Sequence, residues 1–200
     1  MSKVITTPKG KAVWPRIDTP DTKFDEDGVY SCKLHVSEGD FKAFEAIVQP
    51  TLDAAYEAEC SRQGKDKIRM APSTPLRIND EGDHEIYAKQ KAKVHTKTKG
   101  TLEFTIAAVD SQGKKIAMPK IGSGSSLKMA VEVNTWFVPS QGFGYSLRLR
   151  AVQVLDLIEY GGGDSSFGFG AEADGYVGSG ESLNQAFEVA DEADTTNAPF

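Results

Sequence analysis

The sequence predicts a mainly β protein: a small antiparallel barrel that is interrupted by one α-helix and followed by a disordered acidic tail. Three observations carry this prediction. At least five segments alternate apolar and polar residues and are separated by turn signals, which is typical of barrels and sandwiches. One further stretch has apolar residues at helical spacing. Beyond residue 160 the chain is rich in Gly, Ser and acidic residues and has few branched aliphatics to bury.

Two strands are predicted before the helix. Residues 10–17 form a short first strand, in which Pro15 indicates an edge or a bulge because proline cannot donate to a ladder. Residues 28–36 alternate apolar and polar side chains after a turn signal at residues 25–28.

One helix is predicted over residues 37–64. Ser37 can cap its start, with Asp40 three residues later, and Gly64 ends it. Apolar side chains recur between these ends at helical spacing. Pro50 lies in the middle, so the sequence predicts either a kink or two abutting helices.

The remaining strands follow the helix. Residues 84–95 alternate over their whole length, and residues 102–118 predict a hairpin with its turn at residues 110–113. Two long strands are predicted at residues 126–138 and 144–160. Strands on both sides of a single helix indicate a Greek-key barrel of the oligonucleotide-binding (OB) type, with the helix closing its base.

Charge divides the chain into two parts. All 23 Lys and Arg and 19 of the 29 Asp and Glu lie in residues 1–150, which gives this part a net charge of +4, whereas residues 151–200 carry ten acids and no Lys or Arg. We therefore predict a mildly basic domain over residues 1–160 and a flexible acidic tail over residues 161–200. Such asymmetry favours a nucleic-acid binder with an interaction tail. A solubilising tail on an unrelated domain is the alternative.

Composition argues against a membrane or secreted protein. The chain has no run of about 18 apolar residues, as a membrane span requires. Its first residues have no apolar run of signal-peptide length. Cys32 and Cys60 show no metal-type spacing, so we expect a cytoplasmic protein with reduced thiols.

The sequence shows no catalytic, metal or cofactor motif. The Gly-x-Gly within residues 122–128 precedes a predicted strand and has no Gly-Lys-Ser/Thr after it, so it indicates a loop rather than a phosphate cradle. His35, His84 and His95 lack metal-ligand spacing. We therefore expect no cofactor, no metal and no enzymatic activity.

Strand alternation places cations and aromatic rings together on the outside of the barrel. In residues 84–95, three lysines follow a tyrosine on the outward face, and Gln90 is the exception on the inward face. Cations track phosphates, and flat rings stack on unpaired bases at about 1–3 kcal/mol each whatever the sequence. For residues 89–93 alone, a solvated edge that deters aggregation is an equally open interpretation. The candidate DNA-binding residues are Trp14, Arg16, Tyr87, Lys89, Lys91, Lys93, Lys128, Trp136, Arg148 and Arg150.

The last residues carry a short motif. Asp191, Glu192 and Asp194 are followed by Pro199 and Phe200. This resembles the C-terminal tip of bacterial single-stranded DNA-binding proteins, whose acids and Pro-Phe are gripped by a basic rim and an aromatic pocket on partner proteins. Here Thr-Thr-Asn-Ala separates the acids from Pro-Phe, which departs from the bacterial pattern. The whole chain is more similar to the single-stranded DNA-binding proteins of phage replication systems, which join an OB barrel with one helix to an acidic tail ending in an aromatic residue.

The resemblance implies a non-enzymatic protein that binds single-stranded DNA without sequence preference. Its setting would be phage DNA replication, recombination and repair in the cytoplasm of a bacterial host. The tail would recruit a polymerase, helicase or primase. It would also compete with DNA for the basic groove, because a short flexible tether gives an effective concentration in the millimolar range. Whether the protein forms a homodimer stays open.

Two other classes of function remain as alternatives. A β-rich viral structural or assembly protein with a solubilising tail would show no preference for single strands over other polyanions. An enzyme built on the same fold would need a catalytic constellation that the sequence lacks.

Overall fold

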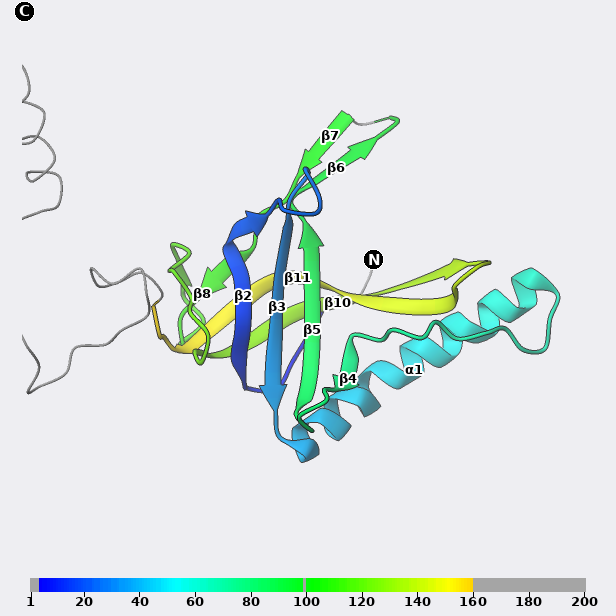
Figure 1. Cartoon of the computed structure of the whole chain (residues 1–200), viewed down its shortest axis with the longest axis horizontal. Coiled ribbons are helices and arrows are strands. Elements are labelled where there is room, and N and C mark those ends of the chain that lie inside the picture. Colours follow the sequence, from blue (N-terminus) through cyan, green and yellow to red (C-terminus); the bar gives the residue numbers. More distant parts are fainter. Residues whose placement is uncertain (1–3, 99, 160–200) are drawn as a thin grey trace, which may run out of the picture. The chain divides into compact units, whose positions relative to one another are not determined.

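Five strands form a closed barrel in the computed structural model, which describes residues 4–98 and 100–159 (Figure 1). They are β2 (Gly10–Asp21), β3 (Val29–Val36), β5 (His84–Lys91), β10 (Ser126–Val138) and β11 (Gly142–Asp156). The order β2–β3–β5–β11–β10 returns to β2, and every pairing is antiparallel except that of β5 with β11. This is the five-stranded Greek-key barrel of the OB fold, and it confirms the predicted fold class.

Short strands extend this barrel. They are β1 (Val4–Thr6), which pairs with β10; β4 (Leu76–Ile78), which pairs with β5; and β8 (Ala107–Val109), which pairs with β11 and with β9 (Lys115–Ile116). A separate hairpin consists of β6 (Lys93–Thr96) and β7 (Gly100–Glu103).

Two strands that the sequence predicts as continuous are divided. Residues 84–95 break at Ala92, whose N–H donates to the carbonyl of Gly28 at 2.8 Å, and the hairpin β6–β7 begins after it. Residues 102–118 supply the end of β7 before β8 and β9 pair around the predicted turn at residues 110–113. Alternation alone misses both breaks because the apolar–polar order continues across them.

The helix α1 (Glu38–Gln63) packs its apolar face against the barrel. Ser37 Oγ accepts a hydrogen bond from Asp40 N at 3.2 Å, and Gly64 ends the helix with a φ of 63°. The helix runs without interruption through Pro50, so the prediction of two abutting helices is wrong. Buried side chains before and after the proline hold both halves to the same surface: Phe41, Phe44, Val48, Leu52 and Cys60.

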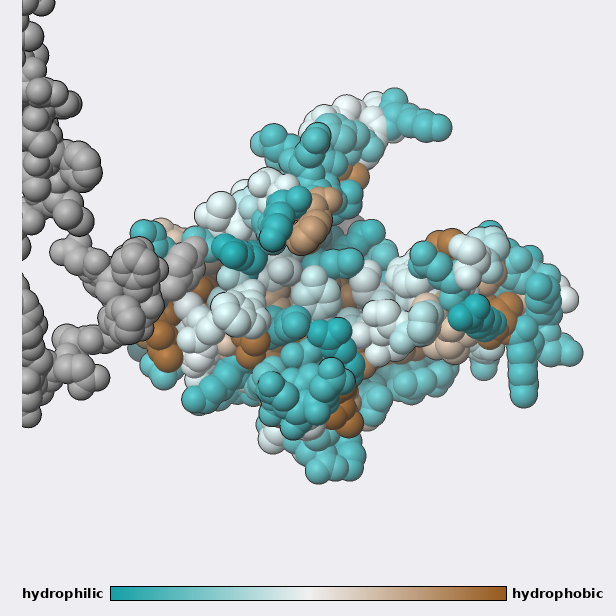
Figure 2. All heavy atoms as spheres, viewed as in Figure 1, coloured by the Kyte–Doolittle hydropathy of each residue, from teal (hydrophilic) through white to brown (hydrophobic). Residues whose placement is uncertain are grey.

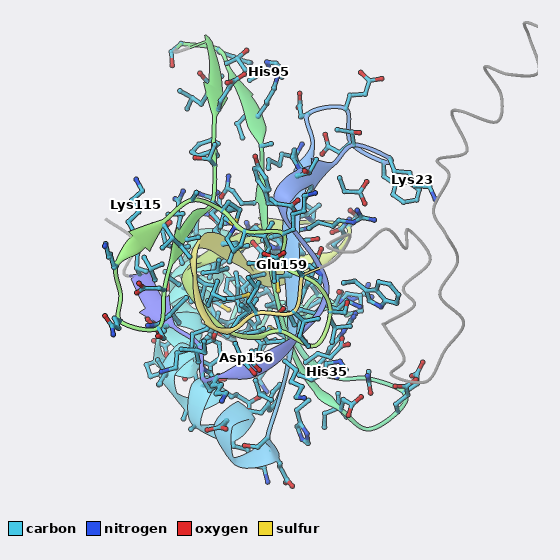
Figure 3. The ribbon with its side chains drawn as sticks, turned by 90° about the vertical axis from the view of Figure 1, so that its left-hand side faces the viewer. Lys23, His35, His95, Lys115, Asp156 and Glu159 are labelled. Carbon is cyan, nitrogen blue, oxygen red and sulfur yellow. The ribbon has the colours of Figure 1, made fainter. Side chains whose placement is uncertain are left out.

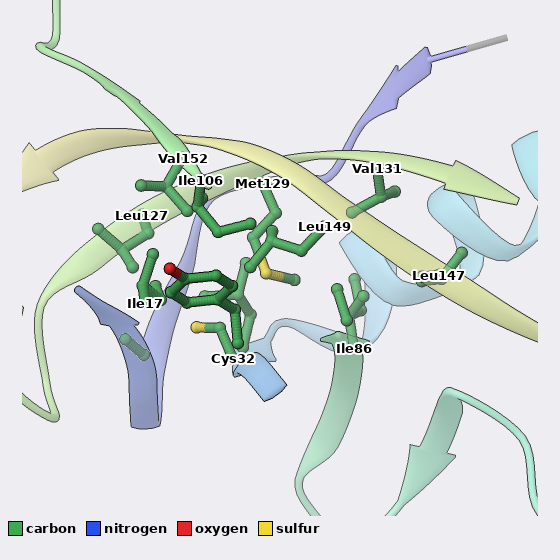
Figure 4. Packing of buried hydrophobic residues seen from close by; sticks show 14 of the residues in the cluster. Ile17, Cys32, Ile86, Ile106, Leu127, Met129, Val131, Leu147, Leu149 and Val152 are labelled. Atoms are coloured by element: carbon green, nitrogen blue, oxygen red, sulfur yellow. The ribbon is translucent and has the colours of Figure 1, made fainter. Parts of the chain in front are cut away.

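The hydrophobic core lies inside the barrel and fixes which side chains face outward (Figure 4). Leu34, Ile86, Leu127, Val131 and Leu149 have no exposed surface, and they come from four different barrel strands. Burying one such side chain stabilises the fold by about 1.5–3 kcal/mol. Because a slip of one residue would turn these side chains outward, the core also fixes the outer face.

Three further observations concern thiol chemistry, membrane insertion and metal binding. Both cysteines are free and buried, and burial raises the pKa of the Cys32 thiol to about 12. In the part of the chain that the structure describes, no helix has the length and apolar character needed to cross a membrane. The same residues contain no cluster of three or more His, Cys, Asp or Glu side chains able to hold a metal ion.

Candidate nucleic-acid interface

The outward side chains of the barrel line three adjoining grooves. The central groove, of about 660 Å³, is lined by Asp21, Phe24, Asp25, Val29, Ser31, Tyr87, Lys89, Gln90, Lys91, Val94, Phe104, Asn134, Ser146, Arg148 and Arg150. The Trp136 groove is lined by Ala71, Pro72, Ser73, Thr74, Pro75, Arg77, Tyr87, Lys89, Trp136, Gln141, Tyr145, Ser146 and Leu147. The Trp14 groove is lined by Trp14, Arg16, Asp21, Ser31, Lys33, Arg77 and Tyr87. Tyr87 lines all three, so the grooves form one surface.

This surface combines positive charge with aromatic rings. Its seven cations are Arg16, Lys33, Arg77, Lys89, Lys91, Arg148 and Arg150, against two carboxylates, Asp21 and Asp25. Its rings are Trp14, Phe24, Tyr87, Phe104, Trp136 and Tyr145. Figure 2 shows the largely hydrophilic face over β2, β3 and β5, with an apolar patch at the loop between β2 and β3. The surface therefore offers both contacts that single-stranded nucleic acid requires.

Eight of the ten predicted residues line this surface, and Lys93 and Lys128 do not. Lys93 lies on β6, where its Nζ is 3.4 Å from Glu103 of the same hairpin. Lys128 lies on β10 opposite Gln153, beyond the β-bulge that displaces the register at Ala130. Alternation predicted that both side chains point away from the core, but it does not show on which side of a closed barrel an outward residue lies.

Lys89 and Arg148 form the electrostatic centre of the surface. They are register partners on the parallel strands β5 and β11. Within residues 4–98 and 100–159 neither has an ion-pair partner, whereas Lys33, Arg77, Lys91 and Arg150 of the same surface do. Like charges on adjacent strands destabilise a sheet. A bound anion such as a phosphate would relieve this repulsion.

A buried carboxylate holds the cations at one flank. Glu85 is 3 % exposed; its Oε2 accepts from Arg77 Nε at 2.7 Å, and its Oε1 lies 3.1 Å from His35 Nε2 and 4.0 Å from Lys33 Nζ. Burial acts to raise the pKa of Glu85, but the hydrogen bonds from Arg77 and His35 outweigh it and lower the pKa. Glu85 is therefore ionised and orients two cations that line the Trp14 groove.

Two more ion pairs hold cations of the central groove. Lys91 Nζ lies 2.9 Å from Asp25 Oδ2, and this hydrogen bond lowers the pKa of Asp25. Arg150 Nη2 donates to Glu132 Oε2 at 2.7 Å, which leaves its Nε buried without a partner in the described part of the chain. A phosphate that binds these cations must compete with a carboxylate already in place.

Tyr87 lies where the three grooves meet. Its side chain is half-buried, and burial raises the pKa of its phenol against the opposing effect of a hydrogen bond with Ser31. Its backbone N–H donates to the carbonyl of Pro75 at 2.8 Å, which ties β5 to the segment before β4. A half-buried ring with a fixed backbone is pre-organised for stacking.

The Trp136 ring lies against the backbone of the neighbouring strand. Trp136 and Gly144 are register partners on β10 and β11. A methyl group at Gly144 would overlap the indole ring, so only glycine allows this close approach. The indole is thereby supported on one side, and it lines the Trp136 groove.

Trp14 is exposed by a strained backbone. It is the only non-glycine residue with positive φ (47°) in the described part of the chain, and 77 % of its surface is exposed. Its N–H donates to Ser123 Oγ at 3.1 Å, and the pairing of β2 with β3 is irregular between Val13 and Arg16, which confirms the bulge predicted from Pro15. Such strain costs about 1–3 kcal/mol and persists where the surrounding structure holds it, commonly at functional sites.

Sequence reasoning missed several lining residues. Lys33 lies opposite Tyr87 on β3, so strand alternation could have identified it had the strand pairing been known. Arg77 belongs to the three-residue strand β4, for which the sequence gives no clear signal. Phe24 and Phe104 lie outside every strand, where alternation does not apply.

Comparison with known proteins identifies the family. The chain is 34 % identical over 155 residues to the single-stranded DNA-binding protein of Escherichia phage T7, which covers 70 % of this chain and 67 % of that protein. The chain belongs to the phage single-stranded DNA-binding proteins. It is also 35 % identical over 151 residues to that protein of Enterobacteria phage T3, covering 68 % of this chain and 65 % of the relative. No protein-family model matches the chain.

Solved structures agree on the fold. The crystal structure of gp2.5, a single-stranded DNA-binding protein encoded by bacteriophage T7, superposes with a TM-score of 0.69 at 25 % identity, over 90 % of this chain and 100 % of that one. The single-stranded DNA-binding protein of bacteriophage Enc34 in complex with single-stranded DNA gives a TM-score of 0.57 at 15 % identity, over 80 % and 89 % of the chains, which is a likeness of fold alone. Phage single-stranded DNA-binding proteins are binding proteins, which confirms the prediction of a non-enzymatic protein.

Replacing Glu85 by Gln should make the free energy of unfolding less dependent on pH in the acid range. Because the folded pKa of Glu85 lies below its ordinary value of 4.5, its ionised form stabilises the fold above pH 4.5 and loses this effect as the pH falls through the lowered pKa. Glu85→Gln should therefore lower the free energy of unfolding by about 1–3 kcal/mol at pH 7, with the difference disappearing at low pH. Denaturant titrations across pH measure this, with the exposed Glu81→Gln as control. A deficit that persists unchanged in acid would contradict the assignment.

Replacing Trp14 by Asn should weaken DNA binding without lowering the stability of the fold. Asn tolerates the left-handed backbone better than other non-glycine residues, and little buried surface is lost, so the free energy of unfolding should not fall. The loss of the ring should weaken single-stranded DNA binding by about 1–3 kcal/mol. Trp14→Ala, which removes the ring but keeps the strain, is the control and should be less stable than the Asn variant. Unchanged DNA affinity in both variants would remove Trp14 from the interface.

Proposed function

We propose that this protein binds single-stranded DNA without sequence preference across its three grooves. The observation that carries the proposal is the Lys89–Arg148 pair beside Tyr87, in a chain of this family. Among the described residues this pair has no carboxylate partner, and the exposed Trp14 and the half-buried Trp136 line the adjoining grooves. The setting that we propose is phage DNA replication, recombination and repair in the cytoplasm of the host.

In the proposed mechanism, the phosphates and the bases of the strand bind to different side chains. Phosphates take the central cations, and their binding releases counterions from the DNA. Unpaired bases stack on Tyr87, Trp14 and Trp136, and any base can do so because every base has a flat face. Duplex DNA keeps its bases stacked on one another and gains only the charge contact. The surface therefore favours single strands.

The acidic tail has two roles in the proposed function, of which the first is competition with DNA. Residues 1–160 form the DNA-binding domain in this proposal, and residues 161–200, with eight acids and no cation, form a tail that competes for the grooves when DNA is absent. The barrel ends beside the Trp14 groove: Gly122 N donates to the carbonyl of Ile158 at 2.6 Å, and Ser123 of the same loop accepts from Trp14 N.

When DNA displaces the tail, we propose that it recruits a replication protein such as a polymerase, helicase or primase. The recruiting residues would be Asp191, Glu192, Asp194, Pro199 and Phe200. Acids beside a Pro-Phe pair suit a partner surface with a basic rim and an aromatic pocket. The same chemistry serves a tail that acts within one chain or across a homodimer.

A titration with a matched pair of lysine variants tests the proposed interface. The full chain should prefer single-stranded over double-stranded oligonucleotides of equal length, measured by fluorescence. Lys89→Ala should weaken binding about fivefold, roughly 1 kcal/mol, and reduce the slope of log affinity against log salt by about one. Lys93→Ala removes the same charge four residues away, outside the grooves, and should change affinity less than twofold. Equal losses from both variants would indicate diffuse attraction rather than this interface, and no strand preference would favour a structural protein.

Removing residues 161–200 should tighten single-stranded DNA binding and steepen its salt dependence, because a competing polyanion no longer neutralises the grooves. Salt titrations of the full and truncated chains measure both effects. Deleting Phe200 alone keeps the acids and serves as the control, so it should spare DNA affinity while abolishing partner capture. Unchanged or weaker binding after truncation would refute the competition.

A further inference from the structure

The loop between β2 and β3, residues 22–28, exposes an aromatic ring at one end of the central groove. Phe24 is 90 % exposed and lines the groove, and Lys23 Nζ lies 5.4 Å from the centroid of its ring. A single exposed apolar side chain needs no explanation by itself. This loop, however, is held in one place by its other residues.

Carboxylates anchor the loop to β5 and to the hairpin β6–β7. Asp25 binds Lys91 at 2.9 Å, and Asp27 Oδ1 lies 2.9 Å from His95 Nε2. Gly28 N also closes a turn onto the carbonyl of Asp25 at 2.8 Å. Figure 3 shows the loop and the hairpin, marked by Lys23 and His95, at the same end of the barrel. Phe24 is therefore presented by an ordered loop, which lowers the entropy lost when a ligand packs on it.

The same end of the groove has a second aromatic wall. Phe104 and Val94 line it, and Phe104 N donates to the carbonyl of Ala92 at 2.7 Å. Because Ala92 N in turn donates to the carbonyl of Gly28 at 2.8 Å, the segment that carries Phe104 is tied to the end of the loop that carries Phe24.

The charges at this end of the groove nearly balance one another. Asp21 and Asp25 line the groove, Asp25 is paired with Lys91, and Lys23 lies beside the Phe24 ring. A phosphate therefore gains less here than at Lys89 and Arg148, whereas a flat, uncharged base can pack on the ring of Phe24.

We propose that Phe24 and Phe104 bound a nucleobase subsite at the loop end of the central groove. The inference rests on the proposed function and adds a subsite to it. It places one base beyond the stacking position at Tyr87, so the bound strand runs past Lys89 and Arg148 toward the loop between β2 and β3.

The test compares two ligands of equal charge on the full chain. One is a thymidine oligonucleotide of about 16 residues, the upper end of the site size per OB fold; the other is an abasic oligonucleotide of the same length. Phe24→Ala should weaken binding of the thymidine oligonucleotide about fivefold or more and leave the abasic affinity unchanged. Phe24→Tyr should bind like the wild type. Ile47→Ala, which removes another exposed apolar side chain from α1 (56 % exposed), should change neither affinity.

The possible results separate a failure of the proposed function from a failure of the subsite. If the wild type shows no preference for single strands, the proposed function fails and the subsite with it. If the wild type binds but Phe24→Ala matches it on the thymidine oligonucleotide, the subsite alone is refuted. Equal losses on both ligands also refute it, because they would show that Phe24 supports the loop and does not contact a base. Equal unfolding midpoints of the variant and the wild type exclude misfolding as the cause of any loss.

Discussion

The parallel pairing of β5 with β11 is the constraint on which the proposed interface depends. It closes the barrel and, in the same step, places Lys89 beside Arg148. The residues on either side of these cations, Ala88 and Leu149, are buried in the core and cannot turn outward without opening the barrel. The repulsion between the two cations is therefore built into the fold, since the core that stabilises the protein also holds them together.

The surface contains further locally unfavourable features, and each has a structural support. Trp14 has a left-handed backbone that Ser123 and the bulge in β2 maintain. Trp136 needs a glycine on the neighbouring strand, although glycine weakens a strand interior. A folded domain has only about 5–15 kcal/mol of net stability, so such features are retained where they serve binding or are offset by packing. Their concentration around Tyr87 agrees with a binding role for this face.

The fold was largely predictable because its signals are local. Alternation identified the long barrel strands, and Ser37 and Gly64 gave the helix ends that the structure has. The breaks at Ala92 and after residue 103 were not predictable, because a strand ends there through its hydrogen-bond partners and not through a change in pattern. Tertiary contacts decide such boundaries.

The interface was predictable where alternation and strand pairing agree. Tyr87 and Lys89 lie on the predicted face because their neighbours Ile86 and Ala88 are apolar and buried. Lys128 has equally clear alternation but lies on another side of the barrel, and alternation cannot separate the sides of a closed cylinder. Arg77, Phe24 and Phe104 reach the grooves through loops and a short strand, so their positions follow only from tertiary structure.

The carboxylates that pair with the flanking cations determine which anions this surface can bind tightly. Glu85, Asp25 and Glu132 already satisfy most of the flanking cations, so a simple polyanion gains little there beyond exchanging one carboxylate contact for another. Among the described residues, Lys89 and Arg148 at the centre offer charge that no ion pair compensates. A ligand that binds tightly must therefore add ring stacking to its charge, and unpaired nucleic acid does both.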